Sequence, residues 1–256
     1  MSNLPQELID KIIGSIDLTS DLEACSLVSH SWRRQSQKQL FSSVRVVGKD
    51  LLKKWYHVVS QNGELPSYVR HVCWYNPLHT PDGESPINIE SRGRFPSFSN
   101  LQSLSLESVD LHTLDNATIE SIFGPLGHSL QYLCISDLKT DPGRWRLLAS
   151  LLPNLQSLSI YKASMGELAL EEDNPPSFPF TGHINFCAPE TVQFFRWVAR
   201  SRPCLRGISA TGFTSTAVIE TLNLVAKNCS ATLTTIILGF QPRQEEGTPQ
   251  LARCAK

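Results

Sequence analysis

This chain of 256 residues lacks an excess of charge of either sign, a long apolar run and any paired-cysteine motif. With a formal net charge of −1, it creates no strong electric field that would attract nucleic acid or an anionic membrane surface. No apolar stretch approaches the roughly 20 residues that a membrane-spanning helix needs. The N-terminus also has no basic region followed by an apolar core, as a secretory signal would. These absences predict a chain with neither nucleic-acid nor membrane partners.

The usual signatures of catalytic and metal sites are missing as well. The seven cysteines and seven histidines show no CxxC or HxxxH spacing, so no metal or other cofactor is expected. The stretch 124–127 lacks the Lys-Ser/Thr ending of a phosphate-binding loop. Cys25 and His30 are the one candidate nucleophile–base pair, but a separation of five residues places them on different helix faces. No catalytic residue is therefore expected. The odd, scattered thiols predict an intracellular protein, cytoplasmic and/or nuclear.

The strongest positive signal lies in the first forty-one residues. Pro5 and Glu7 favour the start of a helix. Ser20 and Glu23 have the spacing of a capping box, which predicts the start of a second helix, and a third helix is expected over 29–40. Apolar residues recur in the first helix at helical spacing: Leu8, Ile9, Ile12, Ile13 and Ile16. A unit this short cannot bury a self-sufficient core, so its apolar surplus predicts that it binds a neighbouring domain or a partner.

This segment resembles the F-box, a three-helix motif that docks adaptor proteins onto a ubiquitin ligase. The matching residues are Leu4-Pro5-x-Glu7-Leu8, Ile12, Ile16, Leu22, Ser26-Leu27-Val28-Ser29, Trp32-Arg33 and Leu40-Phe41. The resemblance implies binding to a Skp-type linker protein and, through it, to a cullin scaffold. The residues that it implies for this contact are Leu4, Pro5, Leu8, Ile9, Ile12, Leu22, Cys25, Leu27, Val28 and Trp32. The alternative is an ordinary first helix that packs on its own domain.

A repeated apolar-x-x-apolar-x-apolar pattern fills the rest of the chain. Its copies lie at 69–74, 98–106, 129–135, 152–160, 204–210 and 232–238. From the copy at 98–106 onward, their first apolar positions are separated by 29, 25, 50 and 28 residues. A leucine-rich repeat has a period of about 20–29 residues, so the longest gap covers two units. A strand hidden at 184–186 would complete the missing one. The chain thus resembles a leucine-rich-repeat protein, although the asparagine that usually follows the third apolar position is mostly absent.

Helical patterns and loops complete the expected organisation. Loops are predicted at 76–99 and 171–176, where prolines cluster. Helices are predicted at 50–60, where Asp50 would cap the helix, and at 115–123, 145–152, 189–200 and 215–228. The fold class is therefore α/β, with a three-helix F-box followed by a leucine-rich-repeat-like solenoid, a curved parallel sheet with outer helices. The expected domains are the F-box (1–45), a linker helix (46–64), a client-binding domain (65–240) and a flexible tail (241–256).

The side chains that alternate with the buried leucines are expected to line the concave face of the sheet. They are small, rich in hydroxyl groups and nearly uncharged, and they lack the arginine cluster that binds phosphorylated peptides. We expect this face to bind a client protein through shape and neutral hydrogen bonds, unless its hydroxyl groups only keep the sheet soluble. The candidate client-binding residues are Tyr75, Ser105, Tyr132, Ser159, Tyr161 and Ser209.

The resemblances together imply a non-catalytic substrate-recognition adaptor. It would hold an unknown client protein near the ubiquitin-charged enzyme of a cullin-based SCF-type ligase and so raise the effective concentration. The alternative is a leucine-rich-repeat interaction scaffold that is not linked to degradation. A stand-alone hydrolase is a remote third possibility, because no catalytic set is present.

Overall fold

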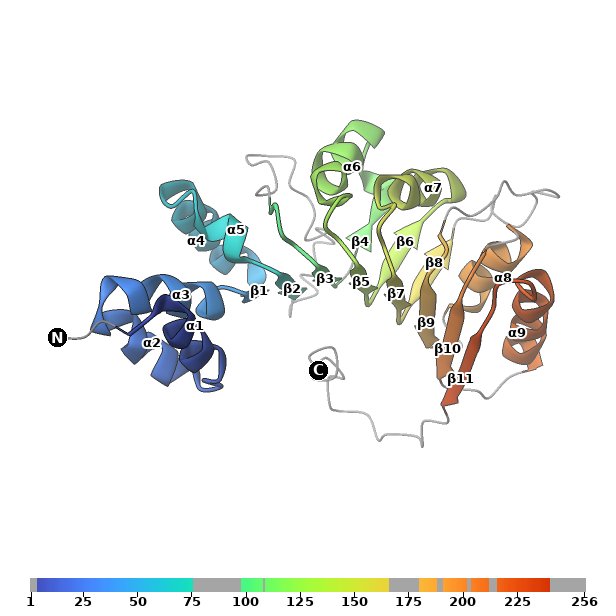
Figure 1. The fold of residues 1–256 in the computed structure, drawn as a ribbon. Helices are drawn as coiled ribbons and strands as arrows, with labels where there is room; N and C mark the ends of the chain where they lie inside the picture. The colour runs from blue at the N-terminus through green and yellow to red at the C-terminus, as the bar shows by residue number, and fades with distance from the viewer. Residues whose placement is uncertain are drawn as a thin grey trace, which may run out of the picture.

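The computed structural model describes residues 4–75, 98–107, 109–165, 180–187, 191–201, 204–211 and 216–239. Most of the expected loop at 76–99, all of that at 171–176 and the tail from 241 lie outside these residues. A three-helix unit at the N-terminus precedes a long curved sheet with helices along its outer side (Figure 1).

The N-terminal unit consists of α1 (Gln6–Gly14), α2 (Thr19–Val28) and α3 (His30–Leu40). Its small core forms from Ile9, Ile13 and Leu22, against which Ile16, Trp32 and Leu40 pack. Ser29 caps α3 by accepting a hydrogen bond from the backbone N–H of Trp32. The apolar spacing seen in the sequence therefore does form helices with a common buried side.

The predicted capping box of α2 is wrong. The backbone carbonyl of Leu18 accepts hydrogen bonds from the N–H groups of Asp21 and Leu22, both at 3.2 Å. The helix therefore begins at Thr19, and Ser20 already lies inside the first turn, where it cannot act as the N-cap. No side chain caps this end of α2.

The main sheet has eight strands, all parallel, in the order β1-β2-β3-β5-β7-β9-β10-β11. The strands are β1 (Ser43–Val47), β2 (His71–Tyr75), β3 (Ser103–Leu106), β5 (Tyr132–Ile135), β7 (Ser157–Ile160), β9 (His183–Cys187), β10 (Gly207–Thr211) and β11 (Thr235–Gly239). Each predicted copy of the repeat contains one of these strands, and β9 confirms the hidden strand at 184–186. The edge strand β1 was not expected.

Two rows of apolar side chains run across the sheet and explain its regular register. The first row is Val44, Val72, Leu104, Leu133, Leu158, Ile184, Ile208 and Ile236. The second row is Val46, Trp74, Leu106, Ile135, Ile160, Phe186, Ala210 and Leu238. Both rows are buried from β2 to β10 and exposed on β11. Burying one large aliphatic side chain stabilises a fold by about 1.5–3 kcal/mol, so the register is strongly defined.

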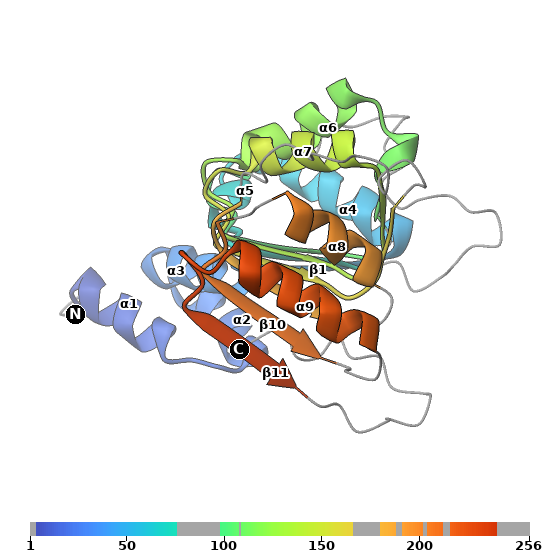
Figure 2. The same cartoon turned by 90° about the vertical axis from the view of Figure 1, so that its right-hand side faces the viewer.

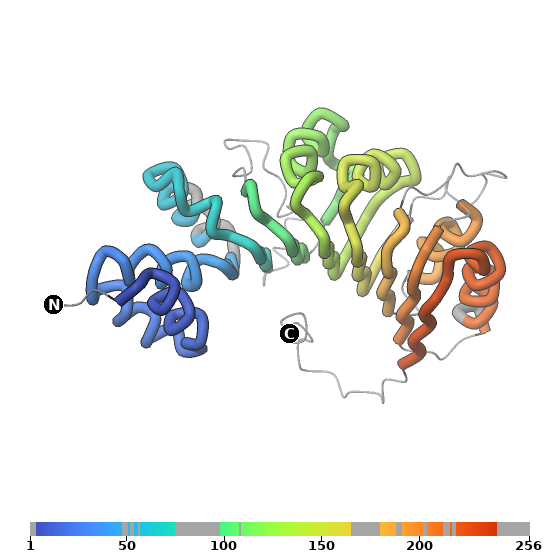
Figure 3. The backbone as a smooth tube through the Cα atoms, viewed as in Figure 1, coloured from blue at the N-terminus to red at the C-terminus, as the bar shows by residue number. Residues whose placement is uncertain are grey.

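Helices cover the outer side of this sheet (Figure 2). The helices are α6 (Asn116–Phe123), α7 (Pro142–Leu151), α8 (Val192–Arg200) and α9 (Thr216–Asn228), with 3-10 turns η1 (Leu111–Thr113) and η2 (Gly124–Leu126). A second parallel sheet, which the sequence did not predict, joins β4 (Val109–Asp110), β6 (Leu138–Thr140) and β8 (Ala163–Met165). The backbone trace follows an arc (Figure 3), consistent with a leucine-rich-repeat-like α/β solenoid.

Asparagine side chains connect neighbouring turns of the solenoid. The amide nitrogen of Asn100 donates to the backbone oxygen of Ser67 at 2.7 Å, and that of Asn154 donates to the oxygen of His128 at 3.0 Å. Both asparagines directly precede the leading leucine of their repeat. These two repeats thus use asparagine one position before the first leucine, instead of after the third apolar position.

The three-helix unit and the sheet are joined without a long linker. Only residues 41 and 42 separate α3 from β1, and β1 leads directly into α4 (Gly48–Gln61), which is followed by α5 (Leu65–Tyr68). The prediction that Asp50 caps α4 is wrong, because Val47 of β1 is the N-cap and residue 50 lies in the first turn. The expected domain boundary at residue 45 falls inside β1.

Side chains reinforce this junction. The rings of Phe41 and Trp55 lie 6.4 Å apart, which connects the end of α3 to α4. On α5, the phenol of Tyr68 donates a hydrogen bond to Glu64 Oε2 at 2.6 Å. This bond raises the pKa of the Tyr68 phenol, and the nearby Arg34 guanidinium of α3 only partly offsets the increase. Arg34 thus brings α3 into contact with the first turn of the solenoid.

Candidate docking surfaces

The first helix has three distinct faces. Ile9 and Ile13 are turned into the core, whereas Leu8 and Ile12, four residues apart on the helix, and Leu4 just before it are exposed apolar residues. The exposed fractions of Leu4, Leu8 and Ile12 are 50%, 46% and 42%. We call Leu4, Leu8 and Ile12 the α1 stripe. An exposed apolar surface next to a closed core is typical of a protein interaction site.

A second exposed apolar feature lies where α2 meets α3. Leu27 and Val28 have exposed fractions of 80% and 65%. Large aliphatic side chains this exposed at the end of a helix make no contribution to the core of the unit. We call Leu27 and Val28 the α2 corner.

The expected linker-binding residues divide into three groups. The α1 stripe, the α2 corner and Pro5 are exposed, while Cys25 and Trp32 are half-buried. Ile9 and Leu22 are buried, with only 4% and 5% of their surface exposed, because they pack against Ile13 in the core. These two side chains hold the docking helices in place and offer a partner almost no surface.

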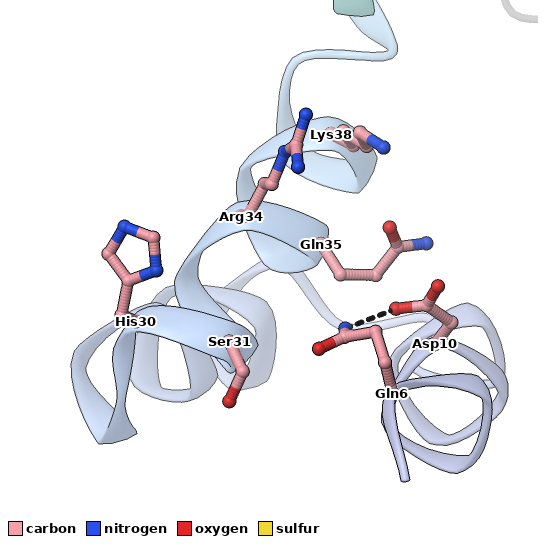
Figure 4. Close-up of a pocket in the computed structure, with 7 residues that line it drawn as sticks. All are labelled: Gln6, Asp10, His30, Ser31, Arg34, Gln35 and Lys38. Carbon is pink, nitrogen blue, oxygen red and sulfur yellow. Dashed lines mark hydrogen bonds between the residues drawn. The ribbon is translucent and has the colours of Figure 1, made fainter.

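The third face of α1 borders a polar cleft of about 270 Å³ between α1 and α3 (Figure 4). On the α1 side, the amide nitrogen of Gln6 donates to Asp10 Oδ1 at 2.7 Å. On the α3 side, His30, Arg34 and Lys38 follow each other at a spacing of four residues. Gln6 and Asp10 each lie two residues, or about 200° of helical rotation, from Leu8. The cleft is therefore on the side of α1 away from the α1 stripe.

The inner face of the main sheet presents polar side chains in two rows, which the strand register defines. One row is Ser43, His71, Ser103, Tyr132, Ser157, His183, Gly207 and Thr235. The other is Arg45, Cys73, Ser105, Cys134, Ser159, Asn185, Ser209 and Ile237. This polar inner face is the surface that the alternation in the sequence predicts.

A scan against protein-family models matches residues 1–43 to the F-box domain. Those residues form an F-box domain. F-box domains bind the Skp-type linker in SCF complexes, and F-box proteins are generally non-catalytic subunits of these ligases. No curated protein matches the chain.

Most of the predicted client-binding residues lie on the inner face. Ser105, Ser159 and Ser209 occupy the same row, and Tyr132 on β5 belongs to the other row. Tyr161 directly follows β7 and is 38% exposed. Tyr75 ends β2, and its side chain lies outside what the structure describes. The structure thus brings Ser159 and Ser209 to either side of β9, while Ser105 is further along the row.

The sequence interpretation missed two residues between these serines, His183 and Asn185 of β9. His183 Nε2 lies 2.9 Å from Ser209 Oγ, and Asn185 Nδ2 donates to Ser159 Oγ at 3.0 Å. The strand at 184–186 was predicted, so the alternation along it was the signal that could have identified both residues. The acidic, proline-rich segment before this strand obscured the start of the repeat in the sequence.

The structure shows no metal or membrane feature within the residues it describes. Among these residues, no three or more His, Cys, Asp or Glu side chains form a group that could hold a metal ion. No helix in the same part of the chain is long and apolar enough to cross a membrane.

Proposed function

We propose that this protein is a substrate-recognition adaptor of a cullin-based SCF-type ubiquitin ligase. Its F-box domain binds the Skp-type linker, and its solenoid binds a client protein for ubiquitination. The chain itself supplies binding and positioning and no chemical group. Holding the client beside the charged enzyme raises its effective concentration there, which is enough to accelerate transfer.

The observation that carries the proposal is the exposure of the α1 stripe and the α2 corner. The core of the F-box domain forms from its few buried residues, and neither the α1 stripe nor the α2 corner belongs to that core. Covering them with a partner would remove apolar surface from water, worth about 25 cal/mol for each Å². The match to the F-box domain supports the Skp-type linker as that partner.

The inner face of the sheet is the proposed client-binding surface. It supports the role because helices occupy the outer side of the sheet (Figure 1), whereas the inner face carries exposed tyrosines and half-buried hydroxyl groups. Tyr132 and Tyr161, which are 47% and 38% exposed, provide large flat surfaces of the kind that dominate binding interfaces. The candidate client residues remain Tyr75, Ser105, Tyr132, Ser159, Tyr161 and Ser209.

A pull-down with the purified Skp-type linker tests the proposal. We expect the intact chain to retain the linker and a Pro5→Ala, Leu8→Asp double variant to lose it, because the carboxylate would lose its hydration in an apolar interface. Ile219→Asp is a matched control, since Ile219 is a 54% exposed aliphatic residue on α9, far from the F-box domain. Thermal unfolding of all three proteins checks that each one folds.

The outcomes separate the two candidate roles. If the intact chain fails to bind the linker, the adaptor role is wrong, and an interaction scaffold unconnected to the ligase takes its place. If the linker binds, the stability of captured partners in cells distinguishes an adaptor from a scaffold. An adaptor shortens the lifetime of its client, and the double variant restores that lifetime.

A further inference from the structure

Five side chains on three adjacent strands are joined by hydrogen bonds on the inner face of the sheet. Asn185 Nδ2 on β9 donates to Ser159 Oγ on β7 at 3.0 Å, and it also lies 3.4 Å from Ser157 Oγ. On the other side of β9, His183 Nε2 lies 2.9 Å from Ser209 Oγ on β10. All these side chains are half-buried. We call Ser157, Ser159, His183, Asn185 and Ser209 the β9 network.

The direction of these bonds leaves both donors and acceptors for a ligand. Because the amide nitrogen of Asn185 donates to the serine oxygens, the hydroxyl hydrogens of Ser157 and Ser159 remain to be donated. Asn185 Oδ1 makes no protein hydrogen bond within the described ranges, so it can accept one. The two strands therefore present donors beside an acceptor, which is the pattern that an amide group needs.

A glycine sets the position of the histidine ring. A Cβ atom at Gly207 would lie 2.0 Å from His183 Nδ1, far inside any possible contact distance. The imidazole thus lies against the backbone of β10, where a side chain of any other residue would displace it. Its hydrogen bond to Ser209 then fixes the ring on the inner face, between β9 and β10.

Among the described residues, the inner-face positions on the four strands around the β9 network carry no full charge. The inner-face positions of β5, β7, β9 and β10 are Tyr132, Cys134, Ser157, Ser159, His183, Asn185, Cys187, Gly207, Ser209 and Thr211. A carboxylate, phosphate or ammonium group bound there would lose water without gaining an opposite charge, at a large cost. A neutral amide would exchange its water for the donors and acceptor of the network. Tyr132, next to Ser157 in register, offers a flat surface beside it.

We propose that the β9 network is an amide-recognition site. It binds an extended, uncharged segment of the client through peptide groups or the carboxamides of Asn and Gln. This site specifies the client chemistry within the proposed function, on which it rests. The linker contact, by contrast, lies on the F-box domain and involves none of these residues.

Selection from a library of random displayed peptides of about ten residues, long enough to cross several strands about 4.8 Å apart, tests the site. The immobilised target is the intact chain without any linker, so a failed linker pull-down leaves this result interpretable. Two target variants accompany it. Asn185→Asp places a carboxylate in the network, and Asn116→Asp makes the same change in the first turn of α6, on the outer side.

We expect the intact chain to enrich uncharged peptides that contain Asn, Gln, Ser or Thr. Asn185→Asp should shift the enrichment toward Lys and Arg, while Asn116→Asp should select the same peptides as the intact chain. For one selected peptide, Gly207→Ala should weaken binding by about tenfold, the effect of losing one well-placed interaction. Enrichment of acidic or basic peptides by the intact chain, unchanged selection by Asn185→Asp, or no enrichment at all would each overturn the proposal.

Discussion

Asp141 combines two stabilising roles in one carboxylate. It caps α7 by accepting a hydrogen bond from the Arg144 backbone N–H at 2.9 Å, and it pairs with Arg144 Nη1 at 2.5 Å. Arg144 also donates from Nε to the backbone oxygen of Leu114 at 3.1 Å, which ties α7 to the preceding turn of the solenoid. Partial burial raises the pKa of Asp141, but the hydrogen bonds and charge of Arg144 outweigh it, and the net pKa is lowered.

The lowered pKa makes part of the stability of the fold sensitive to acid. A depressed carboxyl pKa contributes stability above the ordinary Asp value of about 4, and this stability is lost as the pH falls through the folded value. Asp141→Asn should therefore be less stable than the unmodified chain near neutral pH, and the difference should shrink as the pH falls below 4. Urea unfolding at several pH values measures it.

Asp141→Ala is the companion variant. Asn retains a side-chain oxygen that can cap α7, whereas Ala removes the cap, so Ala should cost about 1 kcal/mol more at every pH. A difference between the Asn variant and the unmodified chain that does not change with pH would contradict the role given to the charge.

At the scale of the elements, the asparagine bridges predict how neighbouring repeats stabilise each other. Asn154→Ala removes the bond to the His128 oxygen and should lower the free energy of unfolding by about 1 kcal/mol. The rate of amide hydrogen exchange should rise first in the turn before β7, because that turn loses its hydrogen bond to the preceding repeat. Asn62→Ala, which loses a bond only to Glu64 two residues away, is the matched control and should leave β7 unchanged.

The strands that the sequence predicted are those with a full apolar-x-x-apolar-x-apolar pattern. In those copies the leading apolar residue precedes the first buried residue of the strand by three positions, as Leu101 precedes Leu104. In the β9 repeat, Phe180 precedes Ile184 by four, so the strand was found only as a missing unit. β4, β6 and β8 have two or three residues each, too few to show a hydrophobic period in the sequence. β1 also fits this pattern through Phe41, Val44 and Val46, but the sequence interpretation assigned Phe41 to the end of the F-box.

The candidate site, like the strands, could be predicted only in part from the sequence. Identity and spacing were enough to locate the F-box domain, but they could not separate exposed from buried apolar residues on one helix. Leu8 and Ile9 are neighbours in sequence with opposite exposures, because a step of 100° moves a side chain from the edge of the stripe into the core. On the inner face, the hydrogen bonds of His183 and Asn185 depend on strands far apart in sequence, which only the fold brings together.

At the scale of the whole molecule, the junction between the F-box domain and the solenoid determines how the two binding surfaces are related. Residues 41 and 42 are the only ones between α3 and β1, and β1 is itself paired with β2. The Phe41–Trp55 contact and the Arg34–Tyr68–Glu64 group add side-chain contacts across this junction. The F-box domain is therefore fixed to the end of the sheet.

Insertion of about eight Gly and Ser residues between Phe41 and Ser42 tests this rigidity. Such a segment has an end-to-end distance of about 15 Å and would free the F-box domain. We expect a larger radius of gyration in small-angle X-ray scattering and unchanged binding of the linker. The same insertion after Ser230, in the turn between α9 and β11, should change the scattering much less. Equal scattering of the two inserted proteins would show that the junction is already flexible.

A fixed junction also bears on which part of a client is modified. The inner face of the sheet has a fixed orientation relative to the F-box domain. Under the proposed role, every bound client is therefore presented to the ligase in a single pose. Only those client lysines that this pose turns toward the charged enzyme are within reach. Under that role, the two residues between α3 and β1 would help to determine the acceptor lysine by fixing this pose.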